Sequence, residues 1–325
     1  MSSTIVTRAP TRLDFGGGWT DVPPYAEREG GAVCNLAIAR YATASVTVAE
    51  HDGRHSPPPA RDPLIVAALC RASLQHASVT LANDFPVGAG LGGSSAAGVA
   101  LAGALAIARG APLLPHALAA ASRSTEVDGL GVPGGYQDHY AAAFGGALLL
   151  TLDAGPVAVE RIPLDLRLRE ELTRRLILVY TGESRVSGDM ITAVREAYLA
   201  GEPRTIRALA RMKALAVEMS AALRGGDIDT LGEQVAEHWT YQRSLHPSIP
   251  TARIDAIVKR AAASGAAGAK ALGASGGGCV IALARAGREV ELSAALGSLG
   301  TLLTFTIDTT GFTVVSRSTE SAGAT

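Results

Sequence analysis

A glycine-rich loop followed by two serines, residues 85–97, contains the residue types best suited to chemistry. Glycine adopts positive φ at little cost, so such a loop can turn its amides toward one point. The Ala- and Leu-rich segment 94–108 is predicted to be a helix, whose N-terminus offers unpaired N–H groups and a positive dipole end. Together they indicate an anion site with phosphate as its usual occupant. Ser94 or Ser95 is placed to join a metal shell. The alternative is a tight turn with a serine N-cap.

Carboxylates surround a second glycine-broken segment, residues 11–25. Arg12, Asp14 and Asp21 are spaced around three consecutive glycines, which abolish regular structure there. A carboxylate in such an open loop can accept hydrogen bonds from sugar hydroxyls, and a nearby arginine can orient a phosphate or a carboxylate. The alternative is a solvated loop in which the aspartates are caps.

A third segment, residues 126–140, carries more carboxylates around a glycine turn. Glu126 ends a predicted helix, and Asp138 follows two glycines, where it is predicted to open a helix and point back at the loop. A pair of carboxylates held across such a turn suits one Mg²⁺ ligand and one proton acceptor. The alternative is that both are helix caps only. A further glycine loop, residues 265–279 with Ser275, is open enough to approach a phosphate closely.

These segments need a framework, and hydrophobic periodicity predicts one. Alternating or β-branched runs predict strands at 4–8, 32–38, 42–49, 79–84, 147–152, 157–162, 176–180, 280–284, 301–307 and 312–316. Helical spacing predicts helices at 63–76, 94–109, 115–126, 188–200, 203–223, 227–245, 251–264 and 288–299. A strongly charged stretch at 163–175 places the domain boundary there, giving domains 1–165 and 166–325. The tail after Arg317 is expected to be disordered.

Composition limits the functional classes. The chain has 325 residues, is 47% hydrophobic and 18% charged, and carries a formal net charge of −1. This length suits two domains, and the neutral balance argues against nucleic acid or a membrane surface as a partner. Three dispersed cysteines without CxxC spacing argue against a disulfide framework and structural zinc, which favours a reducing compartment. With no apolar leader at the N-terminus, we expect a cytoplasmic protein. The oligomeric state stays open, a homodimer included.

The glycine-rich segments occur in a definite order, 8–21, 86–96 and 270–279. In this order they resemble the three motifs of the GHMP small-molecule kinases. Gly-Gly-Trp-Thr-Asp at 17–21 and Gly-Gly-Tyr-Gln-Asp-His-Tyr at 134–140 resemble the sugar-kinase branch with D-glycero-D-manno-heptose 7-phosphate kinases and L-fucokinases. The resemblance implies a two-domain α+β fold. A domain like the second domain of ribosomal protein S5 would pack on a ferredoxin-like C-terminal domain, with ATP and sugar between them.

The resemblance also implies roles for individual residues. Ser95 and Glu126 would hold Mg²⁺, and Asp138 would be the catalytic aspartate. Arg12 would neutralise the transferring phosphoryl group or hold that aspartate, and Asp21 would bind sugar hydroxyls. The loop around the ATP phosphates comprises Gly88, Ala89, Gly90, Leu91, Gly92, Gly93, Ser94 and Ser95. The predicted acceptor-binding residues are Asp14, Gly17, Gly18, Trp19, Thr20, Asp21, Gly135, Asp138, Arg185, Gly276 and Gly277.

Two positions depart from the family pattern. Ser275 replaces a glycine of the third motif, which would tighten that loop or add a donor. Gly93 stands where many relatives have serine or threonine. Neither departure removes a residue that the chemistry needs. A non-catalytic sugar sensor on the same fold would be expected to lack Ser95, Glu126 or Asp138, and all of them are present.

The expected acceptor is heptose 7-phosphate, phosphorylated at its anomeric oxygen on the route to nucleotide-activated heptose for capsule or lipopolysaccharide. Candidates for binding the 7-phosphate are Arg185, Ser187, Arg243 and His246, for which a solvated surface position is the alternative. L-fucose is the second choice of acceptor, because Trp-Thr-Asp-Val-Pro-Pro at 19–24 resembles fucokinases. Against it, such fucokinases usually carry the domain within longer chains.

Overall fold

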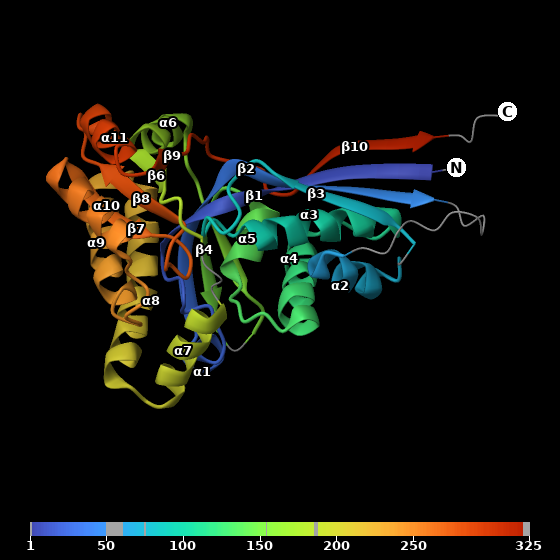
Figure 1. The fold of residues 1–325 in the computed structure, drawn as a ribbon, viewed down its shortest axis with the longest axis horizontal. Coiled ribbons are helices and arrows are strands. Elements are labelled where there is room, and N and C mark those ends of the chain that lie inside the picture. Colours follow the sequence, from blue (N-terminus) through green and yellow to red (C-terminus); the bar gives the residue numbers. More distant parts are fainter. Residues whose placement is uncertain (1, 50–60, 75, 154, 185–187, 321–325) are drawn as a thin grey trace.

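The computed structural model describes residues 2–49, 61–74, 76–153, 155–184 and 188–320. They form a first and a second antiparallel sheet with helices packed on both (Figure 1). The predicted α+β class is therefore confirmed. In neighbour order, the first sheet contains β10 (Thr313–Glu320), β1 (Ser2–Gly16), β2 (Gly31–Ala49), β4 (Ala147–Leu152) and β5 (Ala158–Ile162), and β3 (Ser78–Asn83) also pairs with β2. The second contains β7 (Ala266–Ala271), β8 (Cys279–Ala284), β6 (Leu176–Tyr180) and β9 (Thr301–Leu302).

Strands β1 and β2 are longer than predicted, and they pair with each other in the first sheet. The sequence predicts that the first strand ends before Pro10, but β1 continues past it with a shift in register between Pro10 and Thr11. A proline lacks the N–H that a ladder needs, and an irregularity of this kind accommodates it. The strands predicted at 32–38 and 42–49 are likewise one strand, because β2 pairs with β1 from Cys34 to Ala49, with shifts in register.

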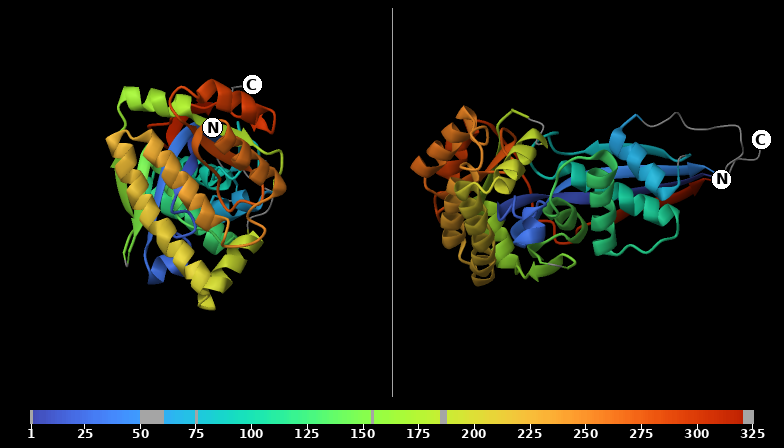
Figure 2. Two further views of the ribbon diagram at one scale, coloured as in Figure 1. Left: turned by 90° about the vertical axis from the view of Figure 1, so that its left-hand side faces the viewer. Right: turned by 90° about the horizontal axis from the view of Figure 1, so that it is seen from below.

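Helices of the first half pack beside the first sheet, and most of those of the second half pack beside the second sheet, but the long helix 203–225 lies against β1 and β2 of the first sheet. The first group is α1 (Tyr25–Arg28), α2 (Pro63–Ala72), α3 (Gly93–Ala108), α4 (Pro115–Ser124), a π-helical turn (Thr125–Gly129) and α5 (Gln137–Phe144). The second is α6 (Leu166–Arg175), α7 (Gly188–Leu199), α8 (Pro203–Gly225), α9 (Ile228–Gln242), α10 (Ala252–Ala263) and α11 (Glu289–Gly297). Seen from the side, α8, α9 and α10 cover the outer part of the second layer (Figure 2).

The last strand corrects two expectations. β10 pairs with β1 in the first sheet, although the sequence analysis groups it with the second half of the chain. It also extends to Glu320, so residues 318–320 are ordered in a strand rather than disordered as expected. The predicted strand 301–307 is reduced to β9. The division into domains 1–165 and 166–325 stays a prediction. β10 belongs to the second predicted domain but pairs with a strand of the first.

Hydrophobic side chains fill a core in each layer and another between the layers. In the first layer α3 packs on β1 and β2, where its alanines and glycines allow a close approach of the backbones. Between the layers, Leu13 and Phe15 of β1 pack with α8 residues such as Leu215 and Met219. In the part of the chain that the structure describes, no helix is long and apolar enough to cross a membrane.

Candidate active site

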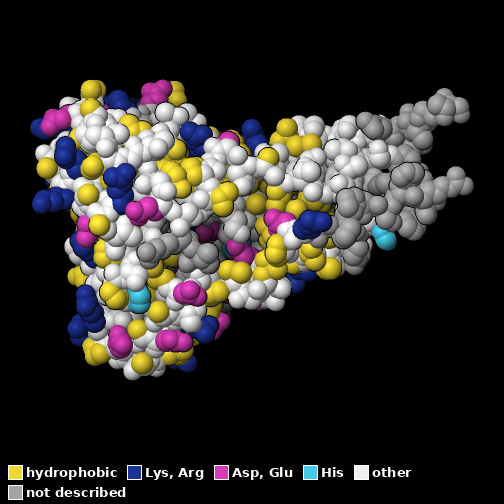
Figure 3. Space-filling view, in the orientation of Figure 1, with side chains coloured by type: hydrophobic (Ala, Val, Ile, Leu, Met, Phe, Trp, Pro, Cys, Tyr) yellow, Lys and Arg dark blue, Asp and Glu magenta, His cyan; other side chains and the backbone are white. Residues whose placement is uncertain are grey.

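A cleft of about 850 Å³ lies between the two layers. Its walls come from the loop after β1, the glycine loop before α3, the turn before α5, and the loop between β7 and β8. Figure 3 shows this face hollowed near the middle of the molecule, with acidic side chains beside the hollow. All three glycine motifs of the sequence therefore meet at one cavity.

The glycine loop presents a helix N-terminus to this cleft. Each of the residues Gly88 to Ser95 lines the cavity. Gly92, with φ of 73°, is the N-cap of α3, and no described side chain caps this helix. The alternative of a serine N-cap is therefore wrong, and the N–H groups of the first turn keep the capacity to bind an anion. A Cβ at Gly92 would lie 3.0 Å from the carboxyl carbon of Asp138, so a larger residue there would crowd the acid.

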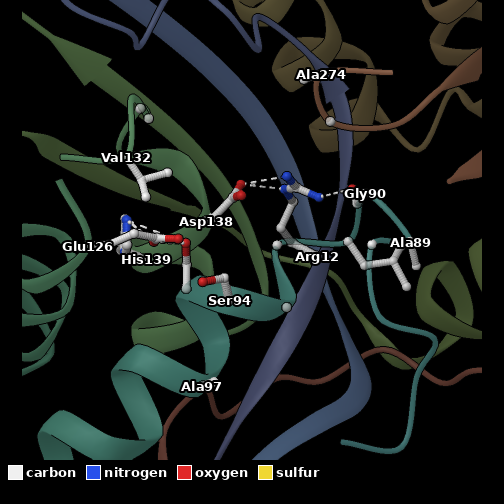
Figure 4. Close-up of a pocket in the computed structure, with 18 of the residues that line it drawn as sticks. Arg12, Ala89, Gly90, Ser94, Ala97, Glu126, Val132, Asp138, His139 and Ala274 are labelled. Atoms are coloured by element: carbon white, nitrogen blue, oxygen red, sulfur yellow. Dashed lines mark hydrogen bonds and ion pairs between the residues drawn. The ribbon is translucent and has the colours of Figure 1, made fainter. Parts of the chain in front are cut away.

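Arg12 joins the glycine loop to Asp138. Its Nε and Nη2 lie 2.7 and 2.6 Å from Asp138 Oδ1, and its Nη1 donates to the carbonyl of Gly90 at 2.7 Å (Figure 4). Its backbone N–H donates to Leu91 at 3.1 Å. Arg12 is 3% exposed and Asp138 28% exposed, so the arginine is fixed while the acid remains reachable from the cleft. Charge-assisted hydrogen bonds of this kind orient a carboxylate tightly.

Glu126 belongs to a buried network on the other side of Asp138. Ser95 Oγ donates to Glu126 Oε2 at 3.0 Å, and His139 Nε2 lies 3.4 Å from the same oxygen (Figure 4). His139 Nδ1 lies 2.9 Å from the hydroxyl of Ser122. Burial lowers the pKa of His139 to about 3, so this contact joins a neutral imidazole to the carboxyl group and is not an ion pair. Burial raises the pKa of Glu126, and the bonded serine hydroxyls offset part of that rise.

The donor set suits Mg²⁺ only together with a ligand that brings oxygen atoms of its own. Among the described residues, no group of three or more His, Cys, Asp and Glu side chains is placed to hold a metal ion. Glu126 and Ser95 nevertheless offer adjacent hard oxygen donors beside the anion site. Mg²⁺ is commonly bound by one or two carboxylates, waters and phosphate oxygens, so these residues fit a metal that arrives with a nucleotide.

The segment after β1 supplies a further part of the wall, next to the turn before α5. Asp21 is buried, and its Oδ2 accepts the N–H groups of Tyr136 and Gln137 at 2.7 and 2.9 Å. The alternative of a solvated loop is therefore wrong, although Asp21 does anchor the start of α5. Burial raises its pKa to about 6, the two N–H groups lower it in part, and the nearby carboxylate of Asp138 raises it further. A Cβ at Gly135 would lie 2.1 Å from Asp21 Oδ2, so this contact requires glycine.

Trp19 is held in an unusual backbone conformation at the edge of the cleft. Its φ is 80°, in a region that bulky residues rarely adopt. The residue is 7% exposed and packs with residues of α7 and α8 such as Met190 and Leu209. This packing offsets the strain of the Trp19 backbone. Strained residues at binding sites are commonly held in place by their surroundings in this way.

The structure brings most of the predicted residues together. Arg12, Gly18, Trp19, Asp21, Glu126, Gly135, Asp138 and Gly277 all line the cleft with the glycine loop. Four predicted acceptor-binding residues do not line it: Asp14, Gly17, Thr20 and Gly276. Asp14 is 1% exposed and bound to Lys270, and the Thr20 hydroxyl donates to the carbonyl of Gly17.

Two of the residues predicted to bind a 7-phosphate, Arg243 and His246, do not line the cleft. Arg243 forms an exposed ion pair with Asp255, and His246 accepts the N–H of Ser248. Arg185 and Ser187 lie outside the described residues. Their proposed contacts stay predictions.

Several buried side chains that support the walls of the cleft are not among the residues predicted from the sequence. His139 stands next to Asp138 but has no companion at metal-ligand spacing, so the sequence gives no signal for it. His238, Gln242 and Lys270 are buried polar residues in regions of helical or strand pattern. A polar residue at a buried position of a periodic pattern is the only signal that could have revealed them.

Comparisons with known proteins agree with this geometry. The family models described as GHMP kinases N terminal domain and GHMP kinases C terminal match residues 63–146 and 206–301. The chain belongs to the GHMP kinases. GHMP kinases use ATP, and the predicted assignment to the family, its fold and its phosphotransferase activity on an alcohol group is confirmed.

Several of the proteins that the chain resembles are sugar kinases. The D-glycero-alpha-D-manno-heptose 7-phosphate kinase of Campylobacter jejuni is 28% identical over 85% of this chain and 88% of its own length. The L-fucokinase/L-fucose-1-P guanylyltransferase of Bacteroides fragilis is 26% identical over 86% of this chain, which spans about a third of that relative (34%). A crystal structure titled D-glycero-D-manno-heptose 1-phosphate kinase, from Bacteroides thetaiotaomicron, has a TM-score of 0.73 at 24% identity and covers 99% of this GHMP kinase. Within the GHMP kinases, the chain is thus similar to sugar kinases along most of its length.

Proposed function

We propose that this kinase transfers the γ-phosphoryl group of ATP to the anomeric hydroxyl of D-glycero-D-manno-heptose 7-phosphate. The product would be the 1,7-bisphosphate, a precursor of nucleotide-activated heptose for capsule or lipopolysaccharide. The observation that carries the proposal is the position of Arg12, which bonds both Asp138 and the carbonyl of Gly90. This contact puts a carboxylate beside the loop that faces the nucleotide phosphates. The heptose 7-phosphate kinase matched along nearly its whole length supports the choice of sugar.

The residues divide the work of phosphoryl transfer. The amides at the start of α3 and the guanidinium of Arg12 stabilise negative charge on the transferring group, which is most of what the reaction requires. Asp138 accepts the proton of the attacking hydroxyl or orients that hydroxyl. Glu126 and Ser95 would hold Mg²⁺, which supplies charge neutralisation of the phosphates when bound. Gly18, Trp19 and Asp21 would bind the sugar from the segment after β1.

One observation favours L-fucose, or another neutral sugar, as a second candidate. Among the described residues that line the cleft, Arg12 is the one arginine or lysine, and it is already bonded to Asp138. A phosphate on the acceptor needs a cation. Of the two arginines predicted to supply it, Arg243 pairs with Asp255 away from the cleft, and Arg185 lies outside the described part of the chain. A neutral sugar has no such requirement.

A panel of acceptors tests the proposal. ADP release is measured with Mg-ATP and heptose 7-phosphate, L-fucose, galactose or mevalonate, and turnover is expected with heptose 7-phosphate. Turnover of fucose alone would show that the acceptor assignment is wrong while the kinase class stands. A cytoplasmic location and a homodimer stay predictions, tested by cell fractionation and by light scattering.

A substitution tests the role of the aspartate. Asp138→Asn is expected to lower kcat by about 10²–10⁴-fold at saturating ATP and sugar, the usual effect of losing a positioned base. Asp128→Asn is the matched control, because Asp128 lies in the neighbouring π-helical turn and bonds Ser124 away from the cleft. Near wild-type turnover of D138N would refute the assignment.

A further inference from the structure

Helix α9 carries two buried polar side chains that hold two different glycine segments. His238 and Gln242 are one helical turn apart, and both are 0% exposed. The N–H of Gly17 donates to His238 Nε2 at 2.9 Å. Gln242 Nε2 lies 3.3, 3.2 and 2.9 Å from the carbonyls of Ala271 and Gly273 and the hydroxyl of Ser275. A single face of one helix thus contacts both segments.

Each of these two side chains stabilises a glycine segment whose backbone conformation is unfavourable without it. Gly17 has φ of 87°, and a Cβ there would lie 1.9 Å from the carbonyl oxygen of Ala32, so the chain turns tightly against β2. Its N–H is buried and would be left unpaired without the histidine. Ser275 has φ of 66°, a conformation that suits glycine better than serine. Its bond to Gln242 offsets the strain of that conformation.

The neighbouring strand adds a second connection to the same segment. Lys270 of β7 donates to Asp14 Oδ2 at 3.0 Å and to the carbonyl of Phe15 at 3.3 Å. The same carboxylate oxygen packs against Gly18, where a Cβ would lie 2.5 Å from it. The chain just before Trp19 is therefore fixed from the second layer at several consecutive residues.

His238 and Gln242 do not line the cleft, yet the residues that they hold lead directly into its walls. Gly18, Trp19 and Asp21 follow Gly17, and the segment 272–275 forms part of the facing wall. We propose that His238 and Gln242 are positioning residues that set the spacing between the acceptor-binding segment and the third glycine loop. His238 acts on acceptor affinity through Gly17, without contact to the sugar. This inference rests on the proposed acceptor site.

Kinetics of His238→Leu and His238→Gln test the proposal. Leucine fills similar space but cannot accept the N–H of Gly17, whereas the glutamine side-chain oxygen can. H238L is expected to raise the KM for the sugar about tenfold, the change expected when one hydrogen bond to a binding loop is lost. The KM for ATP should stay near its wild-type value, because the glycine loop of α3 does not contact His238. H238Q should recover most of the loss.

Ser220→Ala is the matched control. Ser220 is buried on α8 and bonds the carbonyl of Val217 in its own helix, so its loss measures a general effect on stability. If H238L lowers Tm as S220A does and leaves the KM for sugar unchanged, the proposal is wrong. If wild-type enzyme turns over no sugar, the proposed function is wrong, and hydrogen exchange still tests the inference. Faster exchange at residues 16–21 in H238L than in S220A supports it, and equal exchange overturns it.

Gln242→Leu provides a second variant should H238L fail to fold. It removes the bonds to the third glycine loop and leaves the bond between Gly17 and His238 in place. Faster exchange at 271–275, with residues 16–21 unchanged, is the expected result. Unchanged exchange at 271–275 would overturn the proposal for Gln242.

Discussion

Replacing Lys270 by methionine tests the buried ion pair that joins β7 to β1. The Nζ of Lys270 and Oδ2 of Asp14 are 3.0 Å apart, and the side chains are 0% and 1% exposed. Burial by itself would raise the pKa of Asp14, but the charge of Lys270 leads the opposing effects and the pKa is lowered. Asp14 Oδ1 has no hydrogen-bond partner among the described residues. Methionine keeps the chain length but leaves this carboxyl group buried without its cation.

The expected loss is large. Removing one partner of a buried ion pair costs about 3–5 kcal/mol, because the remaining charge is neither solvated nor paired. The chain has 325 residues, and unfolding entropy is about 2.1 cal/mol/K per residue. If the two layers unfold together, Tm should therefore fall by about 4–7 °C.

Thermal unfolding measured by circular dichroism provides the assay, with Arg285→Met as its control. Arg285 and Glu233 form an ion pair of 2.9 Å whose side chains are 48% and 59% exposed. Loss of such an exposed pair costs at most about 1 kcal/mol. The double variant Asp14→Asn with Lys270→Met should recover part of the loss, since it removes the unpaired charge. A Tm of K270M equal to that of R285M would refute the reasoning, as would a double variant less stable than K270M.

Two further predictions concern the cleft. His139→Leu removes the imidazole beside Glu126 and should weaken Mg²⁺ binding about 10–100-fold, as loss of an orienting partner does. Titration calorimetry with Mg²⁺ and a non-hydrolysable ATP analogue measures the Mg²⁺ affinity. An affinity equal to that of the wild type would contradict the prediction. Because the pKa of Asp21 is raised to about 6, its carboxylate becomes protonated as pH falls from 7 to 5, and acceptor affinity without nucleotide should fall about tenfold. Asp21→Asn should bind weakly and lack this part of the pH dependence; an identical pH profile in both proteins would exclude Asp21 as its source.

The sequence predicts the parts of the site that depend on local chemistry. The start of α3 follows from glycine φ freedom and an Ala- and Leu-rich run, and Asp138 follows from a glycine turn before a short helix. The ion pair that Asp14 forms could not be predicted in this way. It lies two residues after Arg12 on the same strand, yet it is bound to Lys270, which is 256 residues away in the chain. Local pattern contains no information about such a distant partner.

Strand pairing was hidden for the same reason. A run such as 312–316 predicts that a strand exists, but its alternation does not name the neighbour. The structure pairs it with β1, across the predicted domain boundary. At Pro10 the local signal led to the opposite error, because it predicted that β1 ends there. The structure shows that the strand continues, since β2 pairs with the residues before and after this proline.

The pairing of β1 with β10 also determines the sequence in which the two sheets can be completed while the chain is synthesised. β1 leaves the ribosome long before β10 is made, although the two lie side by side in the native sheet (Figure 1). The strands of the second sheet are all translated before the first sheet has its last strand. Throughout that interval the outer edge of β1 lacks its partner and is open to pairing with other chains. The first sheet, whose other strands all precede the second sheet in the chain, is therefore the last of the two to be completed.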